Sequence, residues 1–529
     1  MTPATEHNDD SVVQTARTAP RSDRSFLIAR WLFVRCLAAL YLVTFLSLLW
    51  QIPGLLGENG ISPAQENLGL ARFTLGAERY LAFPTLFWLD SSDAFLYLLC
   101  GAGVVGSCLV FLGVAPSLLV PFLWLVHLSF FTVGEDLMEF QWDALLLEIG
   151  FLALFLTPRG LYPGLGRSQP PSALVLWLFR LVLFRLVFIA GAVRLHYVLL
   201  HGVTAFEVPF VSQPVPTLLG WYANNAPTAF RIGLGAVLLV SQLLVPFLVF
   251  MHRRVRVAAS GVLILQQLAL MAIGLHLMTG LLTITVCLTL VDDATWRAFL
   301  PHARKWMRRG PAPAEIAATP FRSFATGMAS LPIVVLSAMQ LLTPVVSEER
   351  WPEHARLVAA LAEPFHIVNM YETFALAPEH RPEIIIEGSM DGKTWKPYGF
   401  RAKTGDTQKP PLWIQPGLSR LDTRMRLAAL TGLSDNLWVI ALMSRLLEGS
   451  PEVLTLLDEN PFPAAPPRHI RAVRYVYTFN DAETAVLEGT WWHREPVGLY
   501  APPMSRPVHF EMARHTPHPG PQFQPAFSY

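Results

Sequence analysis

Long apolar segments, separated by short polar connections, fill the first two thirds of the chain. Most approach the roughly 20 residues that a helix needs to cross a bilayer, although the fourth and eighth are short. This pattern predicts a polytopic domain of about eight or nine transmembrane helices over residues 26–345. The nine segments are 26–50, 93–112, 115–132, 142–157, 172–200, 229–250, 256–274, 277–291 and 324–345.

The charges on the connections predict an orientation, because positive residues favour the cytoplasmic side of a membrane. With the N-terminus inside, the outer connections carry only two arginines, Arg72 and Arg79, among several carboxylates. The inner connections are rich in cations, and these include Arg159, Arg167, Arg253, Arg254, Arg297, Arg304, Lys305, Arg308 and Arg309. An odd number of crossings would then place the region after residue 345 outside the cytoplasm.

The pattern changes after residue 345 and predicts a separate extracytoplasmic α+β domain over residues 346–506. Residues 381–387 and 395–402 alternate as strands around a tight turn at 390–393, and residues 471–479 alternate again. Helical spacing recurs at 421–430, 437–447 and 452–457. The domain is expected to contain a mainly antiparallel sheet, and the polar ends at 1–25 and 507–529 are expected to be disordered tails.

Composition agrees with a membrane protein and excludes several other classes. Of the 529 residues, 53% are hydrophobic and only 15% are charged, and the net charge of +1 gives no reason to expect nucleic acid as a partner. All four cysteines lie in apolar segments, so they are expected to be buried thiols. The run after the N-terminal tail is too long for a cleavable signal core, so it predicts a first membrane helix.

One apolar segment, Gln141–Pro158, carries unusual polar residues: Gln141, Trp142, Asp143 and Glu148. Gln141 and Glu148 share a helical face, about 10 Å apart along the axis. Asp143 lies in the first turn, where it can interact with the positive end of the helix. An ionisable side chain at membrane depth is a functional candidate because it is costly to leave unpaired in hydrocarbon.

The next segment supplies arginines that could pair with this carboxylate. Arg185 lies near the middle of its helix, as Glu148 does in the preceding antiparallel helix, so the two are predicted to pair at matched depth. Such pairs either lock neighbouring helices together or mark a functional site. Arg180 and Arg194, if they stay unpaired, would suit an anionic headgroup or carboxylate.

Other chemistry finds little support in the sequence. Histidines near the outer helix ends, such as His127 and His276, lack zinc-type spacing, so we expect no metal and no cofactor. No lysine lies in a membrane segment. The connection at 209–227 contains Gln213, Pro214, Trp221 and Tyr222, and it predicts either an aromatic membrane anchor or an ordered cap over the outer mouth of the helices.

These features together resemble the lipase maturation factor family, in the form of a bacterial-type member. The resemblance extends in one order over nearly the whole chain after residue 26. In the membrane part the matching stretches are Gln141–Glu148, Leu178–Arg194, Gln213–Pro216 with Trp221–Tyr222, Val245–Phe247 and Asp292–Asp293. In the outer domain they include Pro364–Asn369, Arg381–Gly388 with Glu387, Asp391–Trp395, Arg420–Asp422, Leu446–Pro451, Asn460–Pro463 and Trp491–Pro496 with Trp492 and Arg494.

The chain departs from the family pattern at two places. The loop before Gln213 is shortened to His201–Pro209 and keeps neither of the family's usual motifs, and Arg194 stands where a lysine is common. After Asp422 the expected tryptophans are replaced by Thr423 and Arg426. Ligand or client contacts at the outer mouth are therefore expected to differ from those of relatives.

The resemblance implies a chaperone-like, non-enzymatic role in the maturation of an exported lipase or related client, with membrane lipids as surroundings. Tryptophans of the outer domain, such as Trp395, Trp413 and Trp491, either contact the client or belong to the core. A more distant similarity to the helical domain of vitamin K-dependent γ-carboxylase-like proteins leaves a second hypothesis, a membrane enzyme or lipid-binding protein acting on a lipid or quinone-like substrate. Arginine-rich usage favours a bacterial inner membrane, with the endoplasmic reticulum membrane as the eukaryotic equivalent.

Overall fold

The computed structural model describes residues 25–164, 170–211, 213, 215–275, 277–299, 320–343, 346, 350–371, 381–413 and 419–505, with backbone alone for residues 211 and 320–323. The predicted tails (apart from Ser25), Pro214, His276 and the inner-loop cations from Arg304 to Arg309 lie outside these residues. The described residues form two compact units. Unit 1 draws on Met1–Ile52, Ala64–Glu379 and Pro411–Leu418, and unit 2 on Pro53–Pro63, His380–Pro410 and Ser419–Tyr529.

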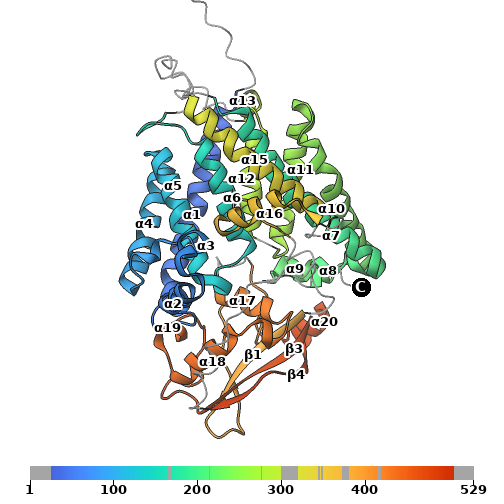
Figure 1. Ribbon diagram of the computed structural model, residues 1–529. Coiled ribbons are helices and arrows are strands. Elements are labelled where there is room, and N and C mark those ends of the chain that lie inside the picture. The colour runs from blue at the N-terminus through green and yellow to red at the C-terminus, as the bar shows by residue number, and fades with distance from the viewer. Residues whose placement is uncertain are drawn as a thin grey trace, which may run out of the picture. The chain divides into compact units, whose positions relative to one another are not determined.

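Unit 1 is built from helices, labelled in Figure 1. Its longer helices are α1 (Leu27–Leu56, whose last turn belongs to unit 2), α2 (Ala64–Leu75), α4 (Asp93–Leu112), α5 (Pro116–Gly134), α6 (Gln141–Leu156), α7 (Ala173–His201), α10 (Thr228–Leu248), α11 (Arg253–Ala272), α12 (Leu277–Cys287), α15 (Pro320–Leu342) and α16 (Glu353–Ala362). Shorter elements are η1 (Gly76–Glu78), α3 (Arg79–Ala82), η2 (Leu86–Trp88), η3 (Glu135–Leu137), η4 (Gly202–Phe206), α8 (Val208–Val211), α9 (Leu218–Asn224), η5 (Leu288–Leu290), α13 (Asp293–Phe299) and η7 (Glu363–Phe365).

All nine predicted apolar segments form helices, but fewer than nine are long enough to cross a membrane. Within the described residues, seven helices meet the length and hydropathy of a span, and the bent pair Leu277–Leu290 and Asp293–Phe299, which turns by 111°, would be an eighth. The short segment is α6, whose 16 residues extend about 24 Å. The polytopic helical fold is therefore confirmed, with α6 as a helix shorter than a full span.

Residues 350–371 also pack within unit 1, although the sequence prediction began the outer domain at residue 346. α16 and η7 lead to a left-handed residue, His366, at φ 49°. The ring of His366 contacts that of Phe131 in α5, with 4.4 Å between their centroids. The part of the chain that precedes the sheet is thus held by the helices of unit 1.

Unit 2 contains a four-stranded antiparallel sheet in the order β2-β1-β3-β4. The strands are β1 (Arg381–Ser389), β2 (Lys396–Pro397), β3 (His469–Phe479) and β4 (Trp492–Ser505), and the helices α17 (Arg420–Ala428), η8 (Leu433–Asp435), α18 (Trp438–Glu448), α19 (Pro451–Leu454) and α20 (Ala482–Glu488) accompany them (Figure 1). The predicted α+β class, the strands at 381–387 and 471–479 and the three helices are confirmed, whereas the strand predicted over 395–402 is reduced to the two residues of β2. β4 was not predicted, and its prolines explain why, since proline within a sheet is tolerated at an edge strand.

Local sequence signals explain the ends of β1. Its alternation buries Ile384 and Ile386 completely, and β1 runs into the predicted turn, where Gly392 adopts φ +72°. Asp391 accepts hydrogen bonds from the backbone N–H groups of Thr394 and Lys393 at 2.7 and 2.9 Å, and these bonds hold its pKa below the usual range. The polar turn residues therefore fix the register of the β1–β2 hairpin.

A buried carboxylate of β1, Glu383, sits among three cations in the core of unit 2. Its oxygens lie 2.9 Å from Arg381 Nη2, 3.2 Å from Lys403 Nζ and 3.8 Å from Arg426 Nε. Burial raises the pKa of Glu383, but attraction to Lys403, Arg381 and Arg426 outweighs burial and leaves its pKa below the ordinary value. Glu383 thus interacts with three cations at once inside this unit.

We predict that Glu383→Gln destabilises unit 2 by about 3–5 kcal/mol, because it leaves the buried cations without their carboxylate. Hydrogen exchange of the β1 amides in the full-length protein measures this loss. Glu387→Gln on the same strand is the matched control, because its pair with Arg471 is only partly buried and such pairs contribute about 1 kcal/mol or less. Equal protection losses in the two variants would contradict the prediction.

The same carboxylate predicts a pH dependence. A lowered pKa in the folded state means that the stabilisation is complete above the ordinary value of 4.5 and is lost as the pH falls below it. Protection of β1, corrected for intrinsic exchange rates, should therefore be constant above about pH 5 and decline as the pH falls below about 4.5. In Glu383→Gln that part of the decline should be absent.

Candidate functional site

Glu148 and Arg185 form the predicted ion pair between α6 and α7. Arg185 Nη2 donates to Glu148 Oε1, and both side chains are 0% exposed. Glu148 lies in the middle of α6, whose two ends are set by extended residues, Phe140 before the helix and Thr157 after it. An extended conformation is expected for Thr157 because it precedes a proline. The pairing at matched depth is therefore confirmed.

Three further groups complete the surroundings of this pair. Tyr371 Oη donates to Glu148 Oε2 at 2.5 Å, and the backbone N–H of Asn369 donates to the same oxygen at 3.1 Å. Arg185 Nη1 donates to Gln340 Oε1 on α15 at 2.5 Å. The pair consequently joins α6, α7, α15 and the segment that follows η7.

The segment containing Asn369 is held to α6 by backbone contacts as well. Asn369 Nδ2 donates to the carbonyl of Ala144 at 3.1 Å and to that of His366 at 2.7 Å. The left-handed conformation of His366 turns the chain so that Asn369 and Tyr371 reach Glu148. The acidic group in the membrane helix is thus satisfied from a part of the chain far away in sequence.

A second buried pair lies near the start of α6. Asp143 Oδ1 is 3.4 Å from His127 Nε2 of α5, with both side chains fully buried. The His127 ring also packs edge-on against Tyr41 and Phe45 of α1. Asp143 does lie in the first turn of α6, as predicted, and its carboxylate faces a histidine of the neighbouring helix. Trp142 stacks on Phe140, with 4.3 Å between the ring centroids.

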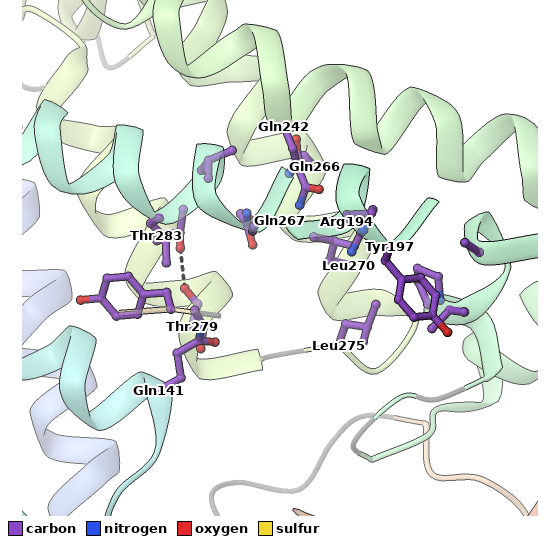
Figure 2. A pocket seen from close by; sticks show the side chains of 17 residues that line it. Gln141, Arg194, Tyr197, Gln242, Gln266, Gln267, Leu270, Leu275, Thr279 and Thr283 are labelled. Atoms are coloured by element: carbon purple, nitrogen blue, oxygen red, sulfur yellow. Dashed lines mark hydrogen bonds between the residues drawn. The ribbon is translucent and has the colours of Figure 1, made fainter. Parts of the chain in front are cut away.

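Gln141 lies beside a cavity of unit 1 that also receives Arg194. The space between the lining side chains is about 880 Å³, including its open mouth. Figure 2 shows the glutamines of α10 and α11 at the top of the view and Gln141 and Thr279 below them. Tyr371 lines this cavity and also bonds to Glu148, so the ion pair and the cavity share a wall. The lining residues are Gln141, Leu186, Val187, Ala190, Arg194, Tyr197, Ala205, Val208, Pro209, Gln242, Gln266, Gln267, Leu270, Leu275, Thr279, Thr283 and Tyr371.

The two remaining arginines of α7 differ in their surroundings. Arg194 lines the cavity, whereas Arg180 does not. Arg180 Nε and Arg194 Nη1 are each buried without an acceptor among the described residues. The sequence grouped these two cations together, and the structure separates them by about 21 Å along the helix.

The described residues of the connection at 209–227 form hydrogen bonds with one another and with the end of α11. Gln213 is buried and its Nε2 donates to the carbonyl of Phe210 at 2.5 Å. Thr217 caps α9, and its hydroxyl donates to the carbonyl of Ala272 at the end of α11 at 2.8 Å. Trp221 is buried and Tyr222 is exposed. The connection therefore packs on the α11 end instead of serving only as an aromatic anchor.

Two carboxylates among the predicted outer-domain residues, Glu387 and Asp422, have bonding partners in unit 2. Glu387 pairs with Arg471 at 2.7 Å, and that guanidinium lies over the Trp395 ring. Asp422 accepts from the backbone N–H groups of Ala402 and Lys403 at 2.6 and 2.8 Å.

The remaining residues of this set are mostly packed. Trp492 belongs to the core with Ile385 and Tyr477, and Trp491 packs beside it. Arg420 is buried, and Arg494 lies over the ring of Tyr475. Trp413, another tryptophan named from the sequence, belongs to unit 1, and 72% of its surface is exposed.

Sequence reasoning missed the polar residues contributed by other helices. Gln340, Gln242, Gln266 and Gln267 were not singled out, nor was Tyr371. A signal was present, because glutamines inside apolar helices are polar groups that must find partners in a membrane. Within the described residues, no group of three or more His, Cys, Asp or Glu side chains is placed to hold a metal ion.

We predict that Glu148→Gln lowers the stability of the full-length protein by about 3–5 kcal/mol, because Arg185 is left buried without its carboxylate. Thermal unfolding in detergent or nanodiscs measures the effect. Arg180→Gln is the control, since Arg180 lies on the same helix outside this cluster.

The double variant Glu148→Gln/Arg185→Gln tests the pairing itself. Removal of both charges should recover part of the loss, since no buried charge remains unpaired. If the stability loss of the double variant equals the sum of the losses of the two single variants, the two side chains act independently.

Comparison with known proteins gives a consistent assignment. The family model described as the lipase maturation factor transmembrane domain matches residues 28–298, and the model of the lipase maturation factor C-terminal domain matches residues 367–502. The chain is 30% identical to lipase maturation factor 1 of Bos taurus over 529 residues, covering 94% of this chain and 93% of that protein. It is 29% identical to lipase maturation factor 2 of Gallus gallus over 588 residues, covering 90% of this chain and 81% of that protein. No solved structure gives a significant match. The chain therefore belongs to the lipase maturation factor family.

Proposed function

We propose that this protein is a membrane-embedded maturation factor that helps an exported lipase, or a related exported protein, to reach its active fold. The observation that carries the proposal is the extent of the family match, which includes both the transmembrane domain and the C-terminal domain in one chain. The curated relatives named above are lipase maturation factors over nearly the full length of this chain. Their names do not favour the second hypothesis of a membrane enzyme.

The cluster around Glu148 supports a role that needs both family domains. Asn369 and Tyr371 lie at the start of the region that matches the C-terminal domain, whereas Glu148 lies within the transmembrane match. Their hydrogen bonds therefore anchor the first residues of the C-terminal domain in the helical unit. A maturation factor that connects membrane helices to a client-binding domain requires a firm attachment of this kind.

The proposed location is the bacterial inner membrane, with the N-terminus in the cytoplasm and the C-terminal domain outside. The excess of arginine on the predicted inner connections supports this orientation. It needs an odd number of crossings, so the short segments α6 and α12 either both cross the bilayer with the seven full-length spans or both do not. The exported client would then meet the C-terminal domain on its own side of the membrane.

Deletion of the gene should lower the specific activity of an exported lipase in the same cells, while its transcript and secreted amount change less. The activity per milligram of secreted enzyme is measured together with quantitative immunoblots and transcript counts. These measurements separate a defect in folding from a decrease in expression or secretion. Wild-type protein and Arg180→Gln should restore the specific activity, whereas Glu148→Gln should restore it less at equal membrane abundance.

Deletion proteomics provides the wider control. If no exported protein changes in specific activity or abundance when the gene is removed, the maturation role is wrong. A change confined to lipid or quinone profiles would instead support the membrane-enzyme hypothesis.

A further inference from the structure

The cavity beside Gln141 has the size and boundaries of a small-molecule site. Its approximately 880 Å³, mouth included, is comparable with ligand pockets of about 300–1,000 Å³. Side chains from α6, α7, α10, α11 and α12 line it, and Tyr371 is a further lining residue. The close approach of α7 and α10 is built into the backbone, because a Cβ on Gly191 would lie only 2.9 Å from Gln242 Cβ.

The charge of this cavity is unbalanced. Among the described residues that line it, Arg194 is the single charged one and none is a carboxylate. Arg194 Nη1 is buried and has no acceptor among the described residues. A buried guanidinium nitrogen without an acceptor is costly, so the site favours a negatively charged group beside Arg194 Nη1.

Neutral polar groups add hydrogen-bonding capacity next to this cation. Gln242 Oε1, Gln266 Nε2 and Thr279 Oγ1 are buried, line the cavity and lack partners within the part of the chain that the structure describes. The other end of the Gln266 amide is fixed, since Ser241 Oγ donates to Gln266 Oε1 at 2.7 Å. These groups can bond to a headgroup that both accepts and donates hydrogen bonds.

The remaining wall is apolar, which favours a ligand that also has an apolar part. Leu186, Val187, Ala190, Leu270 and Leu275 face the same space. A free inorganic anion would satisfy Arg194 but leave this apolar surface against water, whereas an acyl or similar chain would cover it. The Glu148–Arg185 pair, in contrast, already has its partners within the protein.

We propose that this cavity binds an amphiphile with a single anionic headgroup, a carboxylate or a phosphate, whose charge pairs with Arg194 and whose apolar chain lies against α7 and α11. Gln266 and Gln242 bond to the polar part of the headgroup. The ligand is bound and not transformed. This site is independent of the proposed maturation role, since its occupancy is measured on the purified protein without any client.

The test uses the full-length protein in phosphatidylcholine nanodiscs and four probes: oleate, lysophosphatidylglycerol, methyl oleate and inorganic phosphate. We expect saturable binding of oleate or lysophosphatidylglycerol at one site, and the anionic probe that binds identifies the headgroup. Methyl oleate lacks the charge and phosphate lacks the chain, so each should bind more weakly by about tenfold or more.

Variants of α7 assign the binding to this cavity. Arg194→Gln should weaken binding of the anionic probe by about tenfold or more, while Arg180→Gln on the same helix leaves it unchanged. Ala190→Phe, which keeps Arg194 and fills the cavity, should also weaken binding. If Arg194→Gln does not fold, Ala190→Phe tests whether the probe binds in this cavity.

Three results would overturn the proposal. The first is that neither anionic probe binds saturably to the wild-type protein. The second is that methyl oleate or phosphate binds as tightly as the anionic amphiphiles. The third is that Arg180→Gln reduces binding as much as Arg194→Gln, or that a folded Ala190→Phe binds like wild type.

Discussion

The helical unit depends on the solvation of one carboxylate, Glu148, in the middle of a short apolar helix. An isolated charge at this depth is unfavourable by several kcal/mol, and attraction to one buried arginine does not fully offset the desolvation of both groups. The protein adds a hydroxyl from Tyr371 and a backbone N–H from Asn369 to the carboxylate, and the amide of Gln340 to the guanidinium. Each added hydrogen bond fixes another segment in position. The requirement to satisfy one charge therefore brings α6, α7, α15 and the segment after η7 together.

The cavity follows from the same arrangement. Tyr371 is placed by its bond to Glu148, and its ring forms part of the cavity wall. Gln141 reaches the same space from the first turn of α6, and Arg194 enters it from α7 about two and a half turns beyond Arg185. The two arginines thus have different roles on one helix: Arg185 is neutralised by groups of the protein, whereas Arg194 presents an unmatched charge to the cavity.

The sequence predicted features set by local pattern and failed where distant parts meet. Apolar segments located every described helix that is long enough to cross a membrane, and equal depth in antiparallel neighbours was enough to pair Glu148 with Arg185. Nothing local showed that Tyr371 and Asn369, more than 200 residues later, would complete that pair. The glutamines of the cavity were visible as polar residues in apolar helices, but only the fold reveals which of them share a space. In unit 2 the edge strand β4 was missed because its prolines are unfavourable in an ordinary strand.

One of the two departures expected from the family resemblance, the loop at 201–209 with Arg194, lies at the cavity. The loop contributes Ala205, Val208 and Pro209 to the wall, and Arg194 enters the same space from α7. An arginine presents a planar fork to a carboxylate or phosphate, while a lysine would present a compact charge, so Arg194 sets the geometry of recognition. The Gln141–Glu148 stretch, in contrast, builds the ion-pair cluster. The helical scaffold therefore satisfies the charges of Glu148 and Arg185 internally, whereas the cavity leaves Arg194 available to a ligand.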